Sequence, residues 1–221
     1  MEKLLVIRKS SFIILFFLIF SYVNTFAQEN KPEFTINGYV KYIPSYLDYD
    51  FSYFDIRYNH LIHNRLNMRG YFNENFSIGL EMRNRVLFGD DINVFDDKGF
   101  VDLSYFLVEN NDFVFHSMID RFWLKYQKNK IEISIGRQRV NWGINTIWNS
   151  NDLFNAYNFI DFDYIERPGS DVIRFQYTGD NLSSFDLVYK PSLDNGAVIA
   201  GLYKINKMGY DFQFLGANYY D

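Results

Sequence analysis

Residues 76–88 read FSIGLEMRNRVLF, and their polarity alternates from one residue to the next. One set of alternate positions carries Phe, Ile, Leu, Met, Val and Phe with a single Asn, and the other carries Ser, Gly, Glu and two Arg before a final Leu. Side chains of a β-strand point alternately to opposite sides of its sheet, so this stretch is predicted to be a strand. Such a strand separates lipid or an apolar core from water.

The same alternation recurs along the rest of the chain. It is present in residues 34–42, 61–72, 121–126, 131–135, 172–178, 184–190, 197–205 and 210–215. After residue 27 no stretch approaches the roughly 18 consecutive apolar residues of a membrane-spanning helix, and apolar residues at helical spacing are not sustained. We therefore expect an all-β chain with about nine strands in an antiparallel up-and-down arrangement.

The connections between these segments differ in length in a regular way. Short polar turns alternate with long segments, the turns at residues 73–75, 127–130, 178–181 and 206–209 and the long segments at 45–59, 89–112 and 143–170. Aromatic residues make up 20% of the chain, and many flank the short turns. Outer-membrane barrels have short periplasmic turns, long outer loops and aromatic girdles, so a transmembrane β-barrel is predicted. A secreted soluble β-sandwich or jelly roll, including a carbohydrate-active one, is the alternative.

The first 27 residues have the three parts of a cleaved signal peptide. A basic start precedes the apolar run FIILFFLIF at residues 12–20, and small residues at 25 and 27 place the expected cleavage after Ala27. An uncleaved anchor is the alternative, although the run is short for a span of ~20 residues. The absence of Cys fits a Gram-negative envelope protein without disulfides. The prediction is a signal peptide over 1–27 and an outer-membrane barrel domain over 28–221.

Charged residues gather on the face opposite the apolar one. The candidate pore-lining residues are Arg65, Arg69, Glu81, Arg83, Arg85, Arg121, Lys125 and Arg174. Charged side chains on a membrane-spanning strand require water or a partner of opposite charge. In one interpretation a basic ladder lines a hydrated pore and favours anionic solutes. In the other, these residues pair with Glu81, Glu132 or Asp186 and fill a narrow lumen.

The most distinctive stretch is residues 135–170, which begins IGRQRVNWG and ends ERPGS. Here the chain resembles porin-like outer-membrane barrel proteins that carry GRQ-x-x-x-WG and, one long loop later, Pro-Gly before the next strand. That group looks related to alginate-export and phosphate-selective porins. The resemblance covers residues 131–177 and implies a passive or substrate-preferring channel whose loop folds into the lumen. The candidate rim or constriction residues are Arg137, Gln138, Arg139, Trp142, Asp152 and Arg167.

Two details of this stretch stay open. Strict alternation from Ile131 would turn Arg137 and Arg139 toward lipid, so either Gly136 marks a bulge or both arginines lie at the rim. Trp142 is as compatible with an interfacial anchor as with a constriction.

No catalytic residue, metal site or cofactor is predicted. His60 and His63 lack a convincing zinc-site spacing, and Ser117 beside His116 has no third partner for hydrolysis. The acidic residues between positions 90 and 97 lack the spacing of a calcium loop. With 22 Lys and Arg against 27 Asp and Glu, the chain has no basic excess for nucleic acid. The expected partners are outer-membrane lipid and lipopolysaccharide, the barrel-assembly machinery and small solutes.

The strand number bears on completeness and on function. Nine strands that start at the periplasm finish on the wrong side, and single-chain bacterial barrels normally have an even number. A channel of aqueous width needs about 16 strands, so the chain is predicted to be the N-terminal part of a larger barrel, with a complete small barrel as the alternative. The predicted function is a porin-like channel for small solutes in the bacterial outer membrane. A non-conducting structural or adhesive barrel is the second hypothesis.

Overall fold

The computed structural model describes residues 32–48, 56–90, 92, 94, 99–143, 151, 153–154, 168–180, 182–193 and 196–219. The predicted signal peptide, Asp152 and Arg167 lie outside these residues. The described part of the chain is all-β, as predicted. Its strands are β1 (Glu33–Asp48), β2 (Ile56–Tyr71), β3 (Phe76–Gly89), β4 (Ser104–Glu109), β5 (Phe113–Lys128), β6 (Ile131–Gln138), β7 (Ser170–Thr178), β8 (Ser184–Pro191), β9 (Ala197–Lys207) and β10 (Tyr210–Tyr219).

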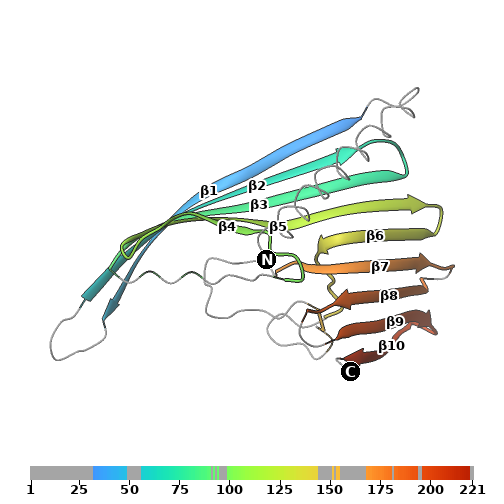
Figure 1. Ribbon diagram of the computed structural model, residues 1–221. Coiled ribbons are helices and arrows are strands. Elements are labelled where there is room, and N and C mark those ends of the chain that lie inside the picture. Colours follow the sequence, from blue (N-terminus) through green and yellow to red (C-terminus); the bar gives the residue numbers. More distant parts are fainter. Residues whose placement is uncertain are drawn as a thin grey trace.

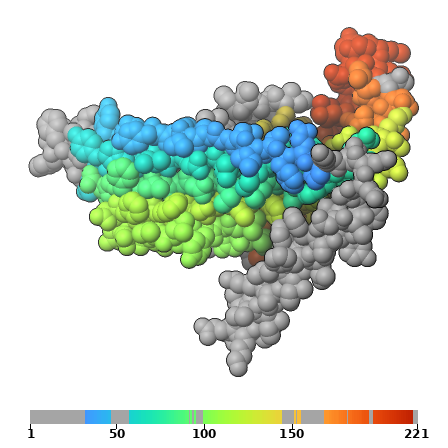
Figure 2. All heavy atoms as spheres, turned by 90° about the horizontal axis from the view of Figure 1, so that it is seen from above, coloured from blue at the N-terminus to red at the C-terminus, as the bar shows by residue number. Residues whose placement is uncertain are grey.

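All ten strands belong to one antiparallel sheet (Figure 1). Its order is β1-β2-β3-β5-β6-β7-β8-β9-β10, with β4 paired to β5 off this path. The antiparallel up-and-down arrangement is therefore confirmed. The sheet is open, because β1 and β10 stand at opposite ends of the order and do not pair with each other. Figure 2 shows β1, β2 and β3 side by side, with the C-terminal strands gathered at one end of the molecule.

The region expected to be a long loop over residues 89–112 contains β4, so the prediction of about nine strands missed one. β4 pairs with the first half of β5, from Ser104 opposite Met118 to Glu109 opposite Val114. β6 pairs with the second half of β5 on the same side. A tight turn joins β4 to β5, with the Asn110 amide donating to the Phe113 carbonyl at 2.9 Å. The expectation that short turns alternate strictly with long segments was therefore wrong for residues 89–112.

A bulge between β3 and β5 adds one residue to β5. Glu81 lies opposite Arg121 and Met82 opposite Ile119, so Asp120 is the extra residue. An extra residue shifts the alternation of every side chain that follows it. The side chains of Asp120 and Arg121 can therefore both point to the same face of the sheet. On that face Asp120 is 1% exposed.

The two faces of the sheet have a polarity opposite to that of a soluble sheet. The outer face, which carries Ile135 and Ile173, exposes large apolar side chains: Leu124, Ile133, Ile135, Ile173, Leu187, Ile199, Phe212 and Phe214. The inner face carries Arg65 and Arg83, each 2% exposed, whereas Ile135 is 50% exposed. The other buried polar side chains of this face include His63, Glu81, Arg85, His116, Asp120, Ser134 and Asp186. The charged side chains are thus covered by the protein, and the aliphatic ones are not.

A small apolar cluster lies on the inner face of the C-terminal strands. Its members from β7, β8 and β9 are Val172, Val188, Val198, Ala200 and Leu202. Val140, Trp142 and Phe154 pack against them from the chain that follows β6. The segment after the GRQ motif therefore covers part of the inner face.

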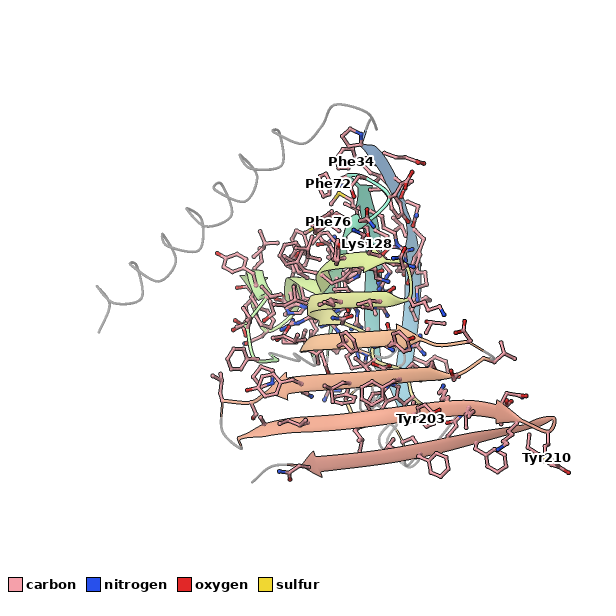
Figure 3. All side chains as sticks on the ribbon, turned by 90° about the vertical axis from the view of Figure 1, so that its right-hand side faces the viewer. Phe34, Phe72, Phe76, Lys128, Tyr203 and Tyr210 are labelled. Atoms are coloured by element: carbon pink, nitrogen blue, oxygen red, sulfur yellow. The ribbon has the colours of Figure 1, made fainter. Side chains whose placement is uncertain are left out.

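Aromatic contacts on the outer face occur near both ends of the long strands. Near the short turns, Phe76 packs on Tyr126 with ring centroids 4.7 Å apart, and Phe34 meets Phe72 at 6.0 Å (Figure 3). At the other end His60 stacks on Phe88 at 4.8 Å. Along β3, Phe76 and Phe88 are about 40 Å apart at ~3.3 Å per residue. At the tilt of ~40° that strands of transmembrane barrels have, this length would correspond to a height of about 30 Å, close to the hydrocarbon thickness of a bilayer.

Gly136, within the GRQ motif, allows a backbone conformation that other residues resist. Its φ is +116°, and a Cβ added there would lie 2.2 Å from the Phe122 carbonyl oxygen. Replacing Gly136 by Ala is expected to lower the free energy of unfolding by about 1–3 kcal/mol. Urea unfolding in detergent measures the change. Gly216→Ala is the matched control, because no heavy atom lies within 4 Å of its added Cβ. Equal effects of the two substitutions would contradict the strain at Gly136.

Candidate functional site: the charged inner face

Arg65 joins two carboxylates from neighbouring strands. One of its Nη2 contacts is Glu81 Oε2 on β3 at 2.5 Å, and the other is Asp120 Oδ2 on β5 at 2.8 Å. Arg121 approaches Glu81 from the other side at 3.2 Å. Arg65, Glu81, Asp120 and Arg121 are called the Arg65 cluster below. The cluster holds three adjacent strands together through side chains.

Arg69 stands at the edge of this cluster. Its Nη2 is 4.0 Å from Glu81 Oε1, and its side chain is 52% exposed. Lys125, further along β5, pairs with Glu132 of β6 at 2.8 Å. These two candidate pore-lining residues are therefore the more accessible ones on this part of the inner face.

Arg83, Arg85, His63 and His116 form a second polar layer further from the short turns. Arg85 Nη2 lies 3.0 Å from His116 Nδ1. An arginine can only donate, so His116 Nδ1 is the acceptor of this hydrogen bond. Both histidines are almost fully buried, His63 at 1% and His116 at 0%. The alternation of residues 61–72 had placed His63 on the polar face with Arg65, whereas His116 lay outside the predicted strands.

Asp186 of β8 organises the inner face of the C-terminal strands. Arg174 of β7 donates to it through Nε at 3.0 Å and Nη2 at 2.5 Å. The indole Nε1 of Trp142 donates to the same carboxylate at 2.7 Å. Trp142 also makes an edge contact with Phe154, with centroids 5.1 Å apart. Trp142 is thus packed on the inner face and does not point to the outer one.

Arg137 has a structural role at the junction of β4, β5 and β6. The register of β6 is unbroken on both sides, so Gly136 does not mark a bulge and Arg137 keeps the outward direction. Its guanidinium pairs with Asp171 through Nε and Nη2, both at 2.9 Å, and donates to the carbonyls of Val101 and Ile119. Only 3% of Arg137 is exposed, because the chain before β4 covers it.

The other candidate rim residues are placed differently from one another. Gln138 is buried and its Oε1 accepts from the Ser134 hydroxyl at 2.7 Å. Arg139 is exposed. Asp152 and Arg167 lie outside the described residues, so their assignment to the rim stays a prediction. Four described rim candidates thus occupy four different environments and do not form one ring.

An ion pair ties two of the short turns together. Lys130, after β5, lies 2.5 Å from Asp180, after β7. The hydrogen bond to Asp180 and its negative charge raise the pKa of Lys130 above the ordinary value of 10.5. Both side chains are well exposed, so solvent screens the pair and its stabilising effect is small.

The residues missed by sequence reasoning are those that pair with the predicted ones. Asp120 completes the Arg65 cluster, His116 contacts Arg85, and Lys204 lies near the Arg174–Asp186 pair. A charge next to Arg121 could have indicated Asp120, but the bulge that turns it inward has no sequence signal of its own.

The described residues contain no group of three or more His, Cys, Asp and Glu side chains placed to hold a metal ion. In the same part of the chain no helix is long and apolar enough to cross a membrane.

No protein-family model, no curated protein and no solved structure matches the chain. The porin-like resemblance of residues 131–177 stays a prediction, and function has to be argued from the geometry of the sheet.

Proposed function

We propose that the sheet is part of the wall of a bacterial outer-membrane β-barrel that acts as a porin-like channel. It would allow passive or substrate-preferring passage of small solutes, with a preference for anions. The observation that carries this proposal is the reversed polarity of the sheet. Its outer face exposes aliphatic side chains, and its inner face buries arginines and carboxylates.

A hydrocarbon surrounding explains this reversal. In water, each exposed apolar side chain would lose about 25 cal/mol of stabilising free energy for every Å² of apolar surface that it leaves unburied. In lipid the same side chains are in a favourable medium, and charges have to turn inward, toward water or one another. At a strand tilt of ~40° the aromatic contacts at the two ends of β3 would be about 30 Å apart along the membrane normal, which agrees with two membrane interfaces.

The charge of the inner face supports the preference for anions. On the described strands, basic inner-face positions outnumber acidic ones. The basic positions are Lys41, Arg57, Arg65, Arg69, Arg83, Arg85, Arg121, Lys125, Arg174, Lys190 and Lys204, and the acidic ones are Glu33, Glu81, Glu109, Asp120, Glu132, Asp186 and Asp211. An excess of one sign along a low-dielectric wall raises the local concentration of oppositely charged solutes.

Membrane insertion requires that both edges of the sheet be paired. An unpaired backbone N–H or C=O group in hydrocarbon costs several kcal/mol, and β1 and β10 each present a row of them. The proposed channel therefore requires pairing partners for the edges at β1 and β10.

A non-conducting structural or adhesive barrel is the second candidate. The observation in its favour is that Trp142, Phe154 and Val140 occupy the inner face of β7, β8 and β9. Together with the crosslinked Arg65 cluster, they reduce the space available for solutes.

Bilayer recordings with the purified, refolded protein distinguish the two candidates. Discrete channel openings and an anion-selective reversal potential in a KCl gradient are expected for the porin-like channel.

Arg69→Glu should shift the reversal potential toward cation selectivity, because Arg69 is the most exposed arginine near the Arg65 cluster. Lys128→Glu, at the exposed end of β5, is the control with the same charge change. Heat-modifiable, detergent-dependent protein without any opening would favour the filled barrel. Monodisperse protein without detergent would contradict both.

A further inference from the structure

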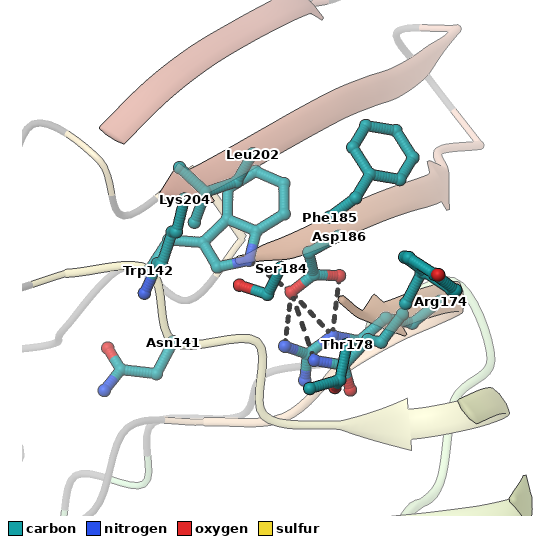
Figure 4. Close-up of a pocket in the computed structure, with 11 residues that line it drawn as sticks. Asn141, Trp142, Arg174, Thr178, Ser184, Phe185, Asp186, Leu202 and Lys204 are labelled. Atoms are coloured by element: carbon teal, nitrogen blue, oxygen red, sulfur yellow. Dashed lines mark hydrogen bonds and ion pairs between the residues drawn. The ribbon is translucent and has the colours of Figure 1, made fainter. Parts of the chain in front are cut away.

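A pocket of about 100 Å³ lies on the inner face where β7, β8 and β9 meet the chain after β6. The residues that matter for its chemistry are Asn141, Trp142, Arg174, Ser184, Asp186 and Lys204. Figure 4 shows Lys204 and Asn141 on one side of the pocket and the Arg174–Asp186 pair on the other. Ser184 begins β8, directly after the short turn that follows β7. The pocket is therefore near the short-turn end of the sheet.

The carboxylate in this pocket, Asp186, is already paired with a cation of the chain. Asp186 accepts hydrogen bonds from the Nε and Nη2 groups of Arg174 and from the indole of Trp142. Gln176 adds a longer contact at 3.5 Å. A carboxylate with a bound guanidinium and a further N–H donor has its charge offset and most of its acceptor positions used. Asp186 is thus not available to neutralise another cation.

Lys204 adds a positive charge that no carboxylate of the described chain balances. Its side chain is half-buried and lines the same pocket. Within the described residues no Asp or Glu lies at ion-pair distance from its ammonium group. The pocket therefore has a net positive charge from Lys204, together with a hydroxyl from Ser184 and an amide from Asn141 that can donate hydrogen bonds.

We propose that this pocket is a binding subsite for the oxyanion group of a small solute, a carboxylate or a phosphate. Lys204 supplies the charge, and Ser184 and Asn141 supply hydrogen-bond donors. A volume of about 100 Å³ corresponds to roughly three water molecules, so the pocket fits an anionic group and not a large solute. The inference deepens the proposed channel function and rests on it, because it names the chemical class of solute that the wall retains near its short-turn end.

Binding can be measured on the full chain refolded in detergent, without any bilayer. Inorganic phosphate and acetate are titrated separately while calorimetry records heat. The combined fluorescence of the three Trp residues, of which Trp142 lines the pocket, is followed in parallel. Saturable binding of at least one anion is expected, and the comparison of the two identifies the preferred group. Lys204→Gln should weaken it about tenfold or more, the size of a lost charged hydrogen bond. Lys207→Gln, on the same strand at its exposed end, should leave binding unchanged.

The charge-retaining variant Lys204→Arg keeps the test decisive if Lys204→Gln folds poorly. It should retain binding within a few-fold of the unmodified chain. Absence of saturable binding, or equal effects of Lys204→Gln and Lys207→Gln, would overturn the subsite. Binding without channel openings would preserve the pocket and reject the channel. Channel openings without anion binding would preserve the channel and reject the pocket as a binding subsite.

Discussion

Replacing Arg65 by Ala is expected to lower the free energy of unfolding by about 3–5 kcal/mol, because it leaves Glu81 and Asp120 buried without their shared cation. Both carboxylates sit in a wall from which water is largely excluded, so solvent cannot replace the guanidinium. Urea unfolding of the refolded protein in detergent, followed by Trp fluorescence and by gel mobility, measures the change.

Arg69→Ala is the matched control, since Arg69 is 52% exposed and only 4.0 Å from the same glutamate. It should cost less than about 1 kcal/mol. The double variant Arg65→Ala with Asp120→Asn should recover part of the loss, because it removes one of the two carboxylate charges that Arg65 offsets. If Arg65→Ala cost no more than Arg69→Ala, the Arg65 cluster would have to be hydrated rather than buried.

Placing a charge on the outer face is expected to have the second large effect. Ile135→Arg puts a guanidinium about 13 Å along β6 from Ile131, which in the proposed membrane wall, at a tilt of ~40°, would be about 10 Å deeper. An Arg near the bilayer midplane costs about 2–4 kcal/mol, whereas one near the interface costs about 0–1 kcal/mol. Ile131→Arg, on the same strand and face, is the matched control beside the short turn. Folding equilibrium in lipid vesicles is the measurement.

The comparison of these two isoleucines also tests the medium around the sheet. Ile135 is 50% exposed and Ile131 39% exposed, so in water neither substitution should matter much. Small and equal costs for both would place the outer face in water. That result would favour the soluble β-sandwich over the membrane wall.

Polarity alternation located the strands whose two faces differ chemically. β3 is the clearest case, because its inner positions carry Ser, Gly, Glu and two Arg before a final Leu, and its outer ones are apolar except for Asn84. β4 was missed since Phe106, Leu107 and Val108 are consecutive and apolar, which erases the period of two. The first half of β5 was missed for a related reason: Val114 and Met118 are apolar residues on the inner face.

The site was predicted in part, and its gaps have physical causes. The inner-face charges follow directly from alternation, but their pairing depends on register, which a single sequence does not specify. Asp120 joins the Arg65 cluster only because a bulge shifts the alternation of β5. Arg137 keeps the outward direction that alternation predicts, yet the chain before β4 covers it and pairs it with Asp171. Contacts between segments distant in the sequence decided both cases.

One edge of β5 pairs with two strands, β4 along its first half and β6 along its second half. This arrangement has a consequence for how a cell would present the protein. β4 extends the sheet along the first half of β5, beyond the level at which β6 begins to pair. In the proposed outer-membrane barrel with its short turns in the periplasm, the hairpin of β4 and β5 would stand on the extracellular side as a lateral projection. Antibodies, phage and neighbouring cells would then meet its exposed turn at residues 110–112. An epitope tag placed in that turn would report, on intact cells, which side of the membrane it occupies.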